Sequence, residues 1–150
     1  MSNAGTENAV TQGKLEIHEL VAKLFHAIDD KNLEAYQSLF VDDASSESPF
    51  GVFQGRAALD SFFAHHIGPG GMGDGRRHFG LNVHADVDGD QGRVTFDLVV
   101  LEVRDVPTVI ATARYDDNEV VYAKGGWRFK KLKQIIDPGF FKSMEQKQPK

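Results

Sequence analysis

The chain has 150 residues, which is enough for one domain with a buried core, and 41% of them are hydrophobic. The formal net charge of -5 argues against a nucleic-acid partner, because phosphate binding needs a concentrated basic surface. Because there is no cysteine, disulfides, thiolate nucleophiles and cysteine–zinc sites are excluded. No apolar run approaches the ~20 residues that span a bilayer, and no secretory signal is recognisable, so we expect a cytoplasmic protein with no membrane partner.

One folded domain is predicted over residues 14–138. The polar segment 1–13 is expected to be disordered. The C-terminal tail spans residues 139–150, and its lysine- and glutamine-rich part, Lys142–Lys150, is expected to be frayed or only loosely docked. The chain contains no internal repeat.

Three helices are predicted in the first half of the domain, because hydrophobic residues recur there at helical spacing. They span residues 14–28, 33–40 and 55–65. Asp30 or Asn32 can cap the second helix, since short polar side chains accept hydrogen bonds from free backbone N–H groups. A short irregular extended segment is expected over residues 44–53.

Strands are predicted after the glycine-rich segment Gly68–Gly75, where the hydrophobic period changes to two. In the first strand, from Arg76, the apolar residues fall on one face and His78 falls on the opposite, polar face. A bend at Gly80 could turn His78 inward. Later strands are expected over residues 93–104, 108–122 and 127–136, with a bulge or bend near residues 116–118.

The order of the predicted elements indicates the fold class. Helices come first and hairpin-linked strands follow, which is typical of an α+β fold with helices on one face of a mostly antiparallel sheet. A doubly wound parallel sheet is disfavoured, since strands and helices do not alternate. The strand over residues 93–104 is apolar on both faces near its middle, which predicts an interior position in the sheet.

Several short segments, taken together, resemble the SnoaL-like branch of the NTF2-like superfamily. They occur in the family's order within residues 14–138: Leu24–Asp43, Gly55–Leu59, His78–Val83, Asp88–Asp90, Arg114–Asp117 and Gly126–Phe129. The resemblance implies a cone in which three N-terminal helices pack on a strongly curved, mostly antiparallel sheet around a small-molecule pocket. Fold alone does not fix function, because the superfamily includes enzymes and binding domains.

Asp97, His78 and Asp29 are the candidate catalytic residues. Asp97 stands mid-strand among apolar residues, where a carboxylate is costly to bury unless it is paired or has a task, and where burial would raise its pKa towards a useful range. The alternative is that Asp97 bonds a neighbouring arginine or hydroxyl, or reaches solvent. His78 matches the family's strand-opening histidine and can exchange protons near neutral pH.

The resemblance also places Asp29 at the family's acid after the first helix, although capping of the next helix is an alternative role. Dehydratase-like members carry a tyrosine about five residues earlier, where this chain has Leu24. The departure weakens the dehydratase interpretation.

Four further residues are candidates for ligand binding, with core packing or strand structure as the alternative: Tyr36, Asn82, Tyr115 and Trp127. No metal site and no cofactor are expected, because no histidine pair has a zinc-like spacing. The segment Asp86–Asp90 imitates a calcium loop, but it fits a hairpin better. Gly68–Gly75 is either a connector or a mobile lid.

The functional hypothesis is a cofactor-free enzyme that moves a proton next to a carbonyl, as a dehydratase, isomerase or cyclase. Its ligand would be small and apolar, of a polyketide-, steroid- or aromatic-like kind, enclosed by aromatic side chains. Two alternatives stay open: a non-catalytic small-molecule-binding domain and a dimeric accessory module. A homodimer is expected in every case, since it would cover the second apolar face of the strand from Val94.

Overall fold

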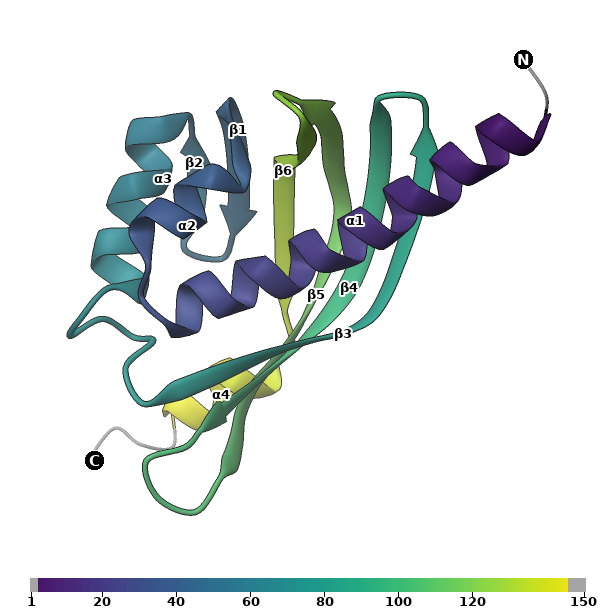
Figure 1. Cartoon of the computed structure of the whole chain (residues 1–150). Helices are drawn as coiled ribbons and strands as arrows, with labels where there is room; N and C mark the ends of the chain where they lie inside the picture. The colour runs from purple at the N-terminus through teal and green to yellow at the C-terminus, as the bar shows by residue number, and fades with distance from the viewer. Residues whose placement is uncertain (1–2, 146–150) are drawn as a thin grey trace.

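A curved six-stranded sheet and a long N-terminal helix dominate the computed structural model, which describes residues 3–145 (Figure 1). The elements in chain order are α1 (Asn3–Asp29), α2 (Leu33–Ser38), β1 (Phe40–Ser48), β2 (Gly51–Gln54), α3 (Arg56–Phe62), the π-helical turn η1 (Phe63–Ile67), β3 (Arg76–Asp88), β4 (Gln91–Glu102), β5 (Thr108–Ala123), β6 (Gly126–Ile136) and α4 (Gly139–Glu145). No helix within this range is both long and apolar enough to cross a membrane.

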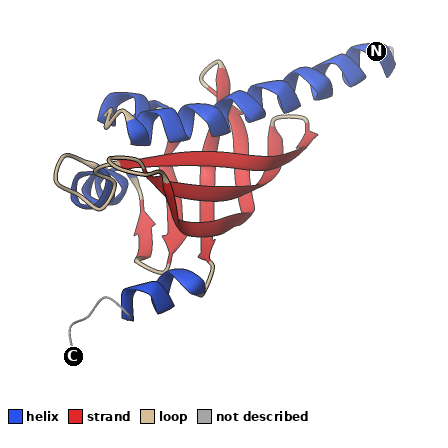
Figure 2. Ribbon diagram, turned by 90° about the horizontal axis from the view of Figure 1, so that it is seen from below, coloured by secondary structure: helices blue, strands red, loops and turns tan. Residues whose placement is uncertain are grey.

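The sheet has the strand order β2-β1-β6-β5-β4-β3. All neighbours are antiparallel except β1 and β6, which confirms the prediction of a mostly antiparallel sheet. β4 lies between β3 and β5, as its two apolar faces predicted. The expected bulge in β5 is present, since the pairing register shifts between Tyr115 and Glu119 and Asp117 has a φ of 57°. Figure 2 shows α1 lying along one side of the curved sheet.

Helix α1 packs on β3 through the predicted stripe, of which Ile17, Val21 and Leu24 are at most 1% exposed. The expectation of a disordered segment over residues 1–13 is wrong for residues 3–13, which extend the same helix. A helix that is nucleated by packing can propagate into polar residues at little cost, because each added residue gains a backbone hydrogen bond. Residues 1 and 2 lie outside the described residues.

The other helices differ from the prediction mainly at their ends. Asn32 caps α2 as expected, since its Oδ1 accepts from the backbone N–H of Ala35 at 3.0 Å, but Phe40 already belongs to β1. The tail from residue 139 is not wholly disordered, because Gly139–Glu145 form α4. The end of the tail, residues 146–150, lies outside the described part of the chain.

Strand β3 changes its inward face near Asn82, and this reverses one prediction. Phe79 and Leu81 were expected on the buried face, yet they are 39% and 46% exposed. The pairing with β4 shifts between Leu81 and His84, and Asn82 has a φ of 53°, as in a bulge. Residues before the bulge therefore alternate in the opposite phase to those after it, which turns His78 inward. The bend lies at Asn82 rather than at Gly80.

Gly80 brings α1 unusually close to β3. A Cβ atom at this position would lie 2.6 Å from Cε2 of Phe25 and 3.1 Å from Cγ1 of Val21. Only glycine leaves room for this approach. The close contact places the last turn of α1, which ends at Asp29, against the start of β3.

Candidate functional site

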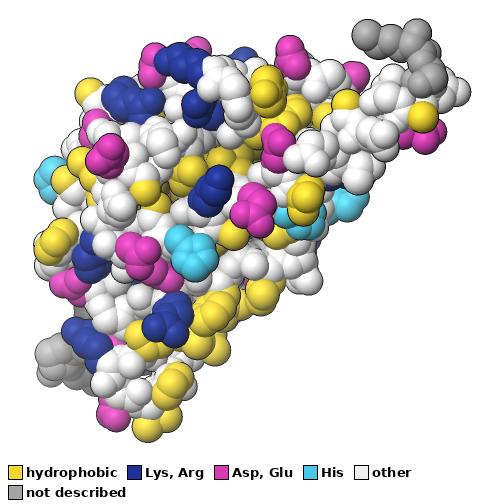
Figure 3. Space-filling model, in the orientation of Figure 1, with side chains coloured by type: hydrophobic (Ala, Val, Ile, Leu, Met, Phe, Trp, Pro, Cys, Tyr) yellow, Lys and Arg dark blue, Asp and Glu magenta, His cyan; other side chains and the backbone are white. Residues whose placement is uncertain are grey.

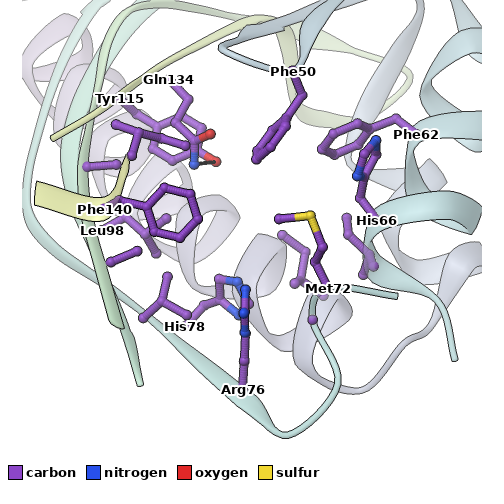
Figure 4. A pocket seen from close by; sticks show the side chains of 17 residues that line it. Phe50, Phe62, His66, Met72, Arg76, His78, Leu98, Tyr115, Gln134 and Phe140 are labelled. Atoms are coloured by element: carbon purple, nitrogen blue, oxygen red, sulfur yellow. Dashed lines mark hydrogen bonds between the residues drawn. The ribbon is translucent and has the colours of Figure 1, made fainter. Parts of the chain in front are cut away.

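A cavity of about 120 Å³ lies where the inner face of the sheet meets α1, α3, η1, the loop 68–75 and α4 (Figure 4). Most of its wall is apolar. Among its lining residues, the side chains with polar groups are His66, Arg76, His78, Tyr115 and Gln134, and none is an aspartate or a glutamate. Such a wall suits an apolar ligand that is held by a few polar contacts.

His78, which lines this cavity, forms a hydrogen-bonded pair with Asp29, which lies behind it at the end of α1. Nδ1 of His78 lies 2.7 Å from Oδ1 of Asp29, and the His78 backbone N–H donates to both carboxylate oxygens at 3.2 and 3.1 Å. The side chains are 16% and 21% exposed, respectively. A carboxylate acceptor at Nδ1 selects the imidazole tautomer with its proton there, which leaves the Nε2 lone pair as the acceptor.

Phe25 also fixes the orientation of the His78 ring. The two rings stack with a 6.2 Å separation of centroids and an interplanar angle of 4°. Phe25 in turn packs edge-on against Phe96 and Tyr115 on the inner face of the sheet. The structure thus brings together two of the three residues predicted to be catalytic, and it holds the imidazole through both a hydrogen bond and a stacked ring.

Tyr115 and Gln134 contribute polar groups from β5 and β6. Nε2 of Gln134 donates to the Tyr115 hydroxyl oxygen at 3.1 Å, and the Tyr115 ring stacks on Phe96 at 4.7 Å. Burial raises the pKa of the Tyr115 hydroxyl, so it stays protonated at neutral pH and can donate a hydrogen bond. Tyr115 is therefore the one predicted ligand-binding residue that lines the cavity.

Asp97, the third candidate catalytic residue, does not line the cavity that His78 lines. Its side chain belongs to the outer face of the sheet, defined here as the face away from α1 and the cavity. There Nε of Arg114 donates to Oδ1 of Asp97 at 2.7 Å, and Asn82 donates to Oδ2 at 2.9 Å. Arg114, and then Asn82, hold the pKa of the Asp97 carboxyl below its ordinary value. Asp97 is therefore bonded to an arginine, which is the alternative role considered in the sequence analysis.

Three of the predicted ligand-binding residues lie outside the cavity lining as well. Tyr36 is 2% exposed and packs between Phe40 and Phe63, with centroids 4.8 Å from each. Trp127 packs edge-on against Tyr122 near the other end of the sheet. Asn82 holds Asp97 at the β3 bulge. All three therefore have the alternative role considered in the sequence analysis: Tyr36 and Trp127 pack against other aromatic rings, and Asn82 belongs to the strand bulge.

Of the lining residues with polar side chains, three were not predicted from the sequence: His66, Arg76 and Gln134. Arg76 could have been found, since it stands two residues before His78 and a strand places such residues on the same face. His66, at the end of the third predicted helix, packs its ring against Phe50 and Phe62 at 5.4 and 4.8 Å. Only the tertiary fold brings η1 opposite the sheet.

The glycine-rich loop 68–75 contributes Met72 and Gly73 to the cavity wall. Asp74 anchors the loop, because its carboxylate accepts from the Gly70 backbone at 2.7 Å and pairs with Lys31 at 2.8 Å. Within residues 3–145 the structure has no group of three or more histidine, aspartate or glutamate side chains that could hold a metal ion.

The comparisons with known proteins agree with this geometry at the level of family and fold. Residues 10–133 match the SnoaL-like domain. The chain belongs to the SnoaL-like family. No curated protein matches the sequence. Among solved structures, an NTF2-like protein with a cystatin-like fold from Novosphingobium aromaticivorans superposes with a TM-score of 0.81 at 21% identity, over 98% of this chain and 96% of that one.

Two other structural relatives of this SnoaL-like domain carry names that suggest an activity. One is a putative scytalone dehydratase from Novosphingobium aromaticivorans, with a TM-score of 0.67 and 20% identity over 81% of this chain and 82% of that one. The other is a type 2 hexachlorocyclohexane dehydrochlorinase, LinA, with a TM-score of 0.69 and 19% identity over 85% and 86% of the two chains. At such identities the likeness shows the fold alone.

Proposed function

We propose that this SnoaL-like protein is a cofactor-free acid–base enzyme that removes a proton next to a carbonyl group of a small, largely apolar molecule. The observation that carries the proposal is the Asp29–His78 pair, with 2.7 Å between Nδ1 and Oδ1, whose histidine lines an apolar cavity. The dehydratase and dehydrochlorinase names of two structural relatives are consistent with elimination chemistry, which begins with the same kind of proton removal.

In this proposal His78 is the general base and Asp29 orients it. The Nε2 atom carries the free lone pair and takes the proton, while the Asp29 carboxylate stabilises the imidazolium that forms. The apolar wall excludes water, which strengthens both interactions.

Tyr115 supplies the complementary acid in the same scheme. When carbon loses its proton, the electron pair moves into the carbonyl and an enolate oxygen develops. The Tyr115 hydroxyl already accepts from Gln134, so its own proton is available to donate to that oxygen. Isomerisation and elimination of water share this first step and differ only in where the proton or leaving group goes next.

Two single-ring ketones test the proposal. Cyclohexanone reports deuterium uptake at its α-carbon in D2O by NMR. 3-Hydroxycyclohexanone reports elimination, since loss of the C2 proton and the C3 hydroxyl gives cyclohexenone and water. We expect saturable turnover of at least one probe. His78→Gln and Asp29→Asn should each reduce kcat about 10²- to 10⁴-fold, and Tyr115→Phe about 10²- to 10³-fold.

The matched control is His84→Gln, a histidine on the same strand whose side chain is 74% exposed and contributes nothing to the cavity lining. This variant should retain wild-type turnover. Turnover that survives in His78→Gln would contradict the proposal. Saturable binding of both ketones without exchange or elimination would instead favour the non-catalytic binding domain.

We also propose that the protein forms a homodimer through the outer face of the sheet. Four hydrophobic side chains on this face, Phe79, Leu81, Val109 and Ile135, are 39 to 58% exposed. They share this face because directly paired residues of neighbouring strands point to the same side of a sheet. Leu81 pairs with Asp97, Asp97 with Arg114, and Arg114 with Ile135, while Phe79 pairs with Val99 and Val109 with Leu101 on the same face. Figure 3 shows hydrophobic side chains along the lower edge of the molecule, over β3. Contiguous apolar surface of this kind is typical of interfaces.

A further inference from the structure

Arg76 places a positive charge on the wall of an otherwise apolar cavity. It is the first residue of β3, it precedes His78 by two positions, and both side chains line the cavity. Figure 4 shows Arg76 entering the cavity on the same side as His78. Desolvation by the surrounding residues lowers the pKa of the Arg76 guanidinium, although it stays charged at any physiological pH.

No carboxylate within the described chain, residues 3–145, forms an ion pair with Arg76. The acid opposite it in the β3–β4 ladder is Glu102. However, Glu102 is held by Arg104, whose Nε and Nη2 atoms donate to its two carboxylate oxygens, both at 2.9 Å. Arg104 also donates its backbone N–H to Glu102 at 3.0 Å. Glu102 therefore already has a guanidinium of its own.

Gly75 allows this arrangement. Its φ of 71° lies in the left-handed region, and a Cβ there would fall 2.1 Å from Nε of Arg104. A larger residue would push the Arg104 side chain off Glu102, and the carboxylate could then turn to Arg76. With glycine at position 75, Arg104 stays bonded to Glu102. Arg76 therefore has no ion pair within the described residues.

We infer that the ligand of this cavity is a monocarboxylate with an apolar body, and that Arg76 binds the carboxylate. Glu102 attracts Arg76 electrostatically, but it is bonded to Arg104 and forms no ion pair with Arg76. A partly buried guanidinium without a direct ion pair is unfavourable, and a bound anion would reduce that cost. The planar fork of guanidinium N–H groups matches the two oxygens of a carboxylate. A phosphate dianion fits less well, because no second cation lines the cavity to balance its second charge.

The geometry also sets the size of the ligand and its orientation. A cavity of about 120 Å³ is somewhat smaller than the ~150 Å³ cavity that holds benzene in an engineered protein, so the part of the ligand that it encloses is no larger than about one ring. Residues two apart in a strand stand about 6.6 Å from each other. When the ligand carboxylate is bound to Arg76, a ligand carbon close to that carboxylate would therefore lie near His78. The binding of a carboxylate by Arg76 does not depend on the proposed function, whereas a reaction of the bound ligand at His78 does.

Benzoate and its neutral isostere benzamide test the inference without requiring turnover. We expect calorimetry to show that wild-type protein binds benzoate about 10- to 100-fold more tightly than benzamide, as for a hydrogen bond to a charged group. Arg76→Met should remove this preference. The matched control is Arg77→Met, which deletes the same charge from the next residue, an exposed side chain on the outer face, and should leave both affinities unchanged.

Several results would overturn the inference. These are equal affinity of wild-type protein for the two probes, absence of benzoate binding, or an equal loss of benzoate affinity in Arg76→Met and Arg77→Met. If Arg76→Met does not fold, Arg76→Lys keeps the charge without the fork and should bind benzoate more weakly while still preferring it to benzamide. Benzoate has no hydrogen on the carbon next to its carboxylate, so its binding is measured without turnover. A failure of acid–base catalysis therefore leaves the preference for benzoate intact. Equally, a failure to prefer benzoate would leave the acid–base proposal intact.

Discussion

At the scale of residues, the position of a carboxylate decides between a chemical and a structural role. Asp29 accepts three hydrogen bonds from His78 at the end of α1, and His78 lines the cavity. Asp97 stands among apolar residues in the sequence, but its side chain lies on the outer face, where Arg114 neutralises it. Two aspartates in one chain therefore differ in role because of the face on which the fold places them.

The Asp97–Arg114 pair leads to a prediction about pH. Arg114 and Asn82 lower the pKa of Asp97 in the folded state, so the ionised carboxylate stabilises the fold above the unfolded pKa of about 4. This stabilisation is lost as the pH falls through the folded pKa. We expect Asp97→Asn to lower Tm by about 1 to 3 °C at pH 7, and the difference from wild type to shrink as the pH falls through the lowered pKa of Asp97. Thermal unfolding followed by circular dichroism measures both.

Asp88→Asn is the control for this experiment, because Asp88 is exposed and forms no ion pair within residues 3–145. It should change Tm little at either pH. A deficit in Asp97→Asn that is equally large at pH 7 and below pH 3 would show that the effect is not ionic. Turnover of a ketone probe should be unaffected, since Asp97 lies away from the cavity.

At the scale of elements, the contact of α1 with β3 builds the site. Val21 and Phe25 pack over Gly80, and one turn later the same helix ends at Asp29 beside His78. The bulge at Asn82 determines that His78 faces this helix rather than solvent. A small change in the spacing between the two elements should therefore disturb stability and the Asp29–His78 hydrogen bond together.

Gly80→Ala tests this dependence. The added methyl group would lie 2.6 Å from Phe25, so α1 or the ring must move, and we expect a loss of about 1 to 3 kcal/mol in the free energy of unfolding. Urea denaturation gives this value, and NMR of the His78 ring nitrogens reports the hydrogen bond. Gly126→Ala is the control, because a Cβ there meets nothing within 4 Å. Equal stability of the two variants would refute the close-approach argument.

At the scale of the whole molecule, the two faces of the sheet have separate tasks. The inner face carries the cavity and the core, whereas the outer face carries the exposed patch of Phe79, Leu81, Val109 and Ile135. The shift of phase in β3 links them, because turning His78 inward necessarily turns Phe79 and Leu81 outward. The exposure of Phe79 and Leu81 is thus a geometric consequence of placing His78 in the cavity.

Leu81→Lys tests the proposed dimer. Wild-type protein should sediment at twice the monomer mass of 16.6 kDa, and the charge introduced into the patch should shift it to monomer. Val52→Lys is the control, since Val52 is 68% exposed on β2, at the opposite edge of the sheet. Wild-type protein that sediments as a monomer at micromolar concentration would contradict the proposal.

The sequence by itself determined the family, the α+β class, the antiparallel hairpins and most element boundaries, because these depend on local periodicity, turn residues and capping. It also supplied His78 and Asp29 as candidates through the resemblance. Only the tertiary structure decided which side chains meet. The positive φ at Asn82 reversed the faces of β3, and cross-strand pairing gave Asp97 to Arg114. Packing also brought Arg76 and His66, 10 residues apart in sequence, to one cavity. Periodicity cannot encode such contacts, since they depend on strand register and on the approach of distant elements.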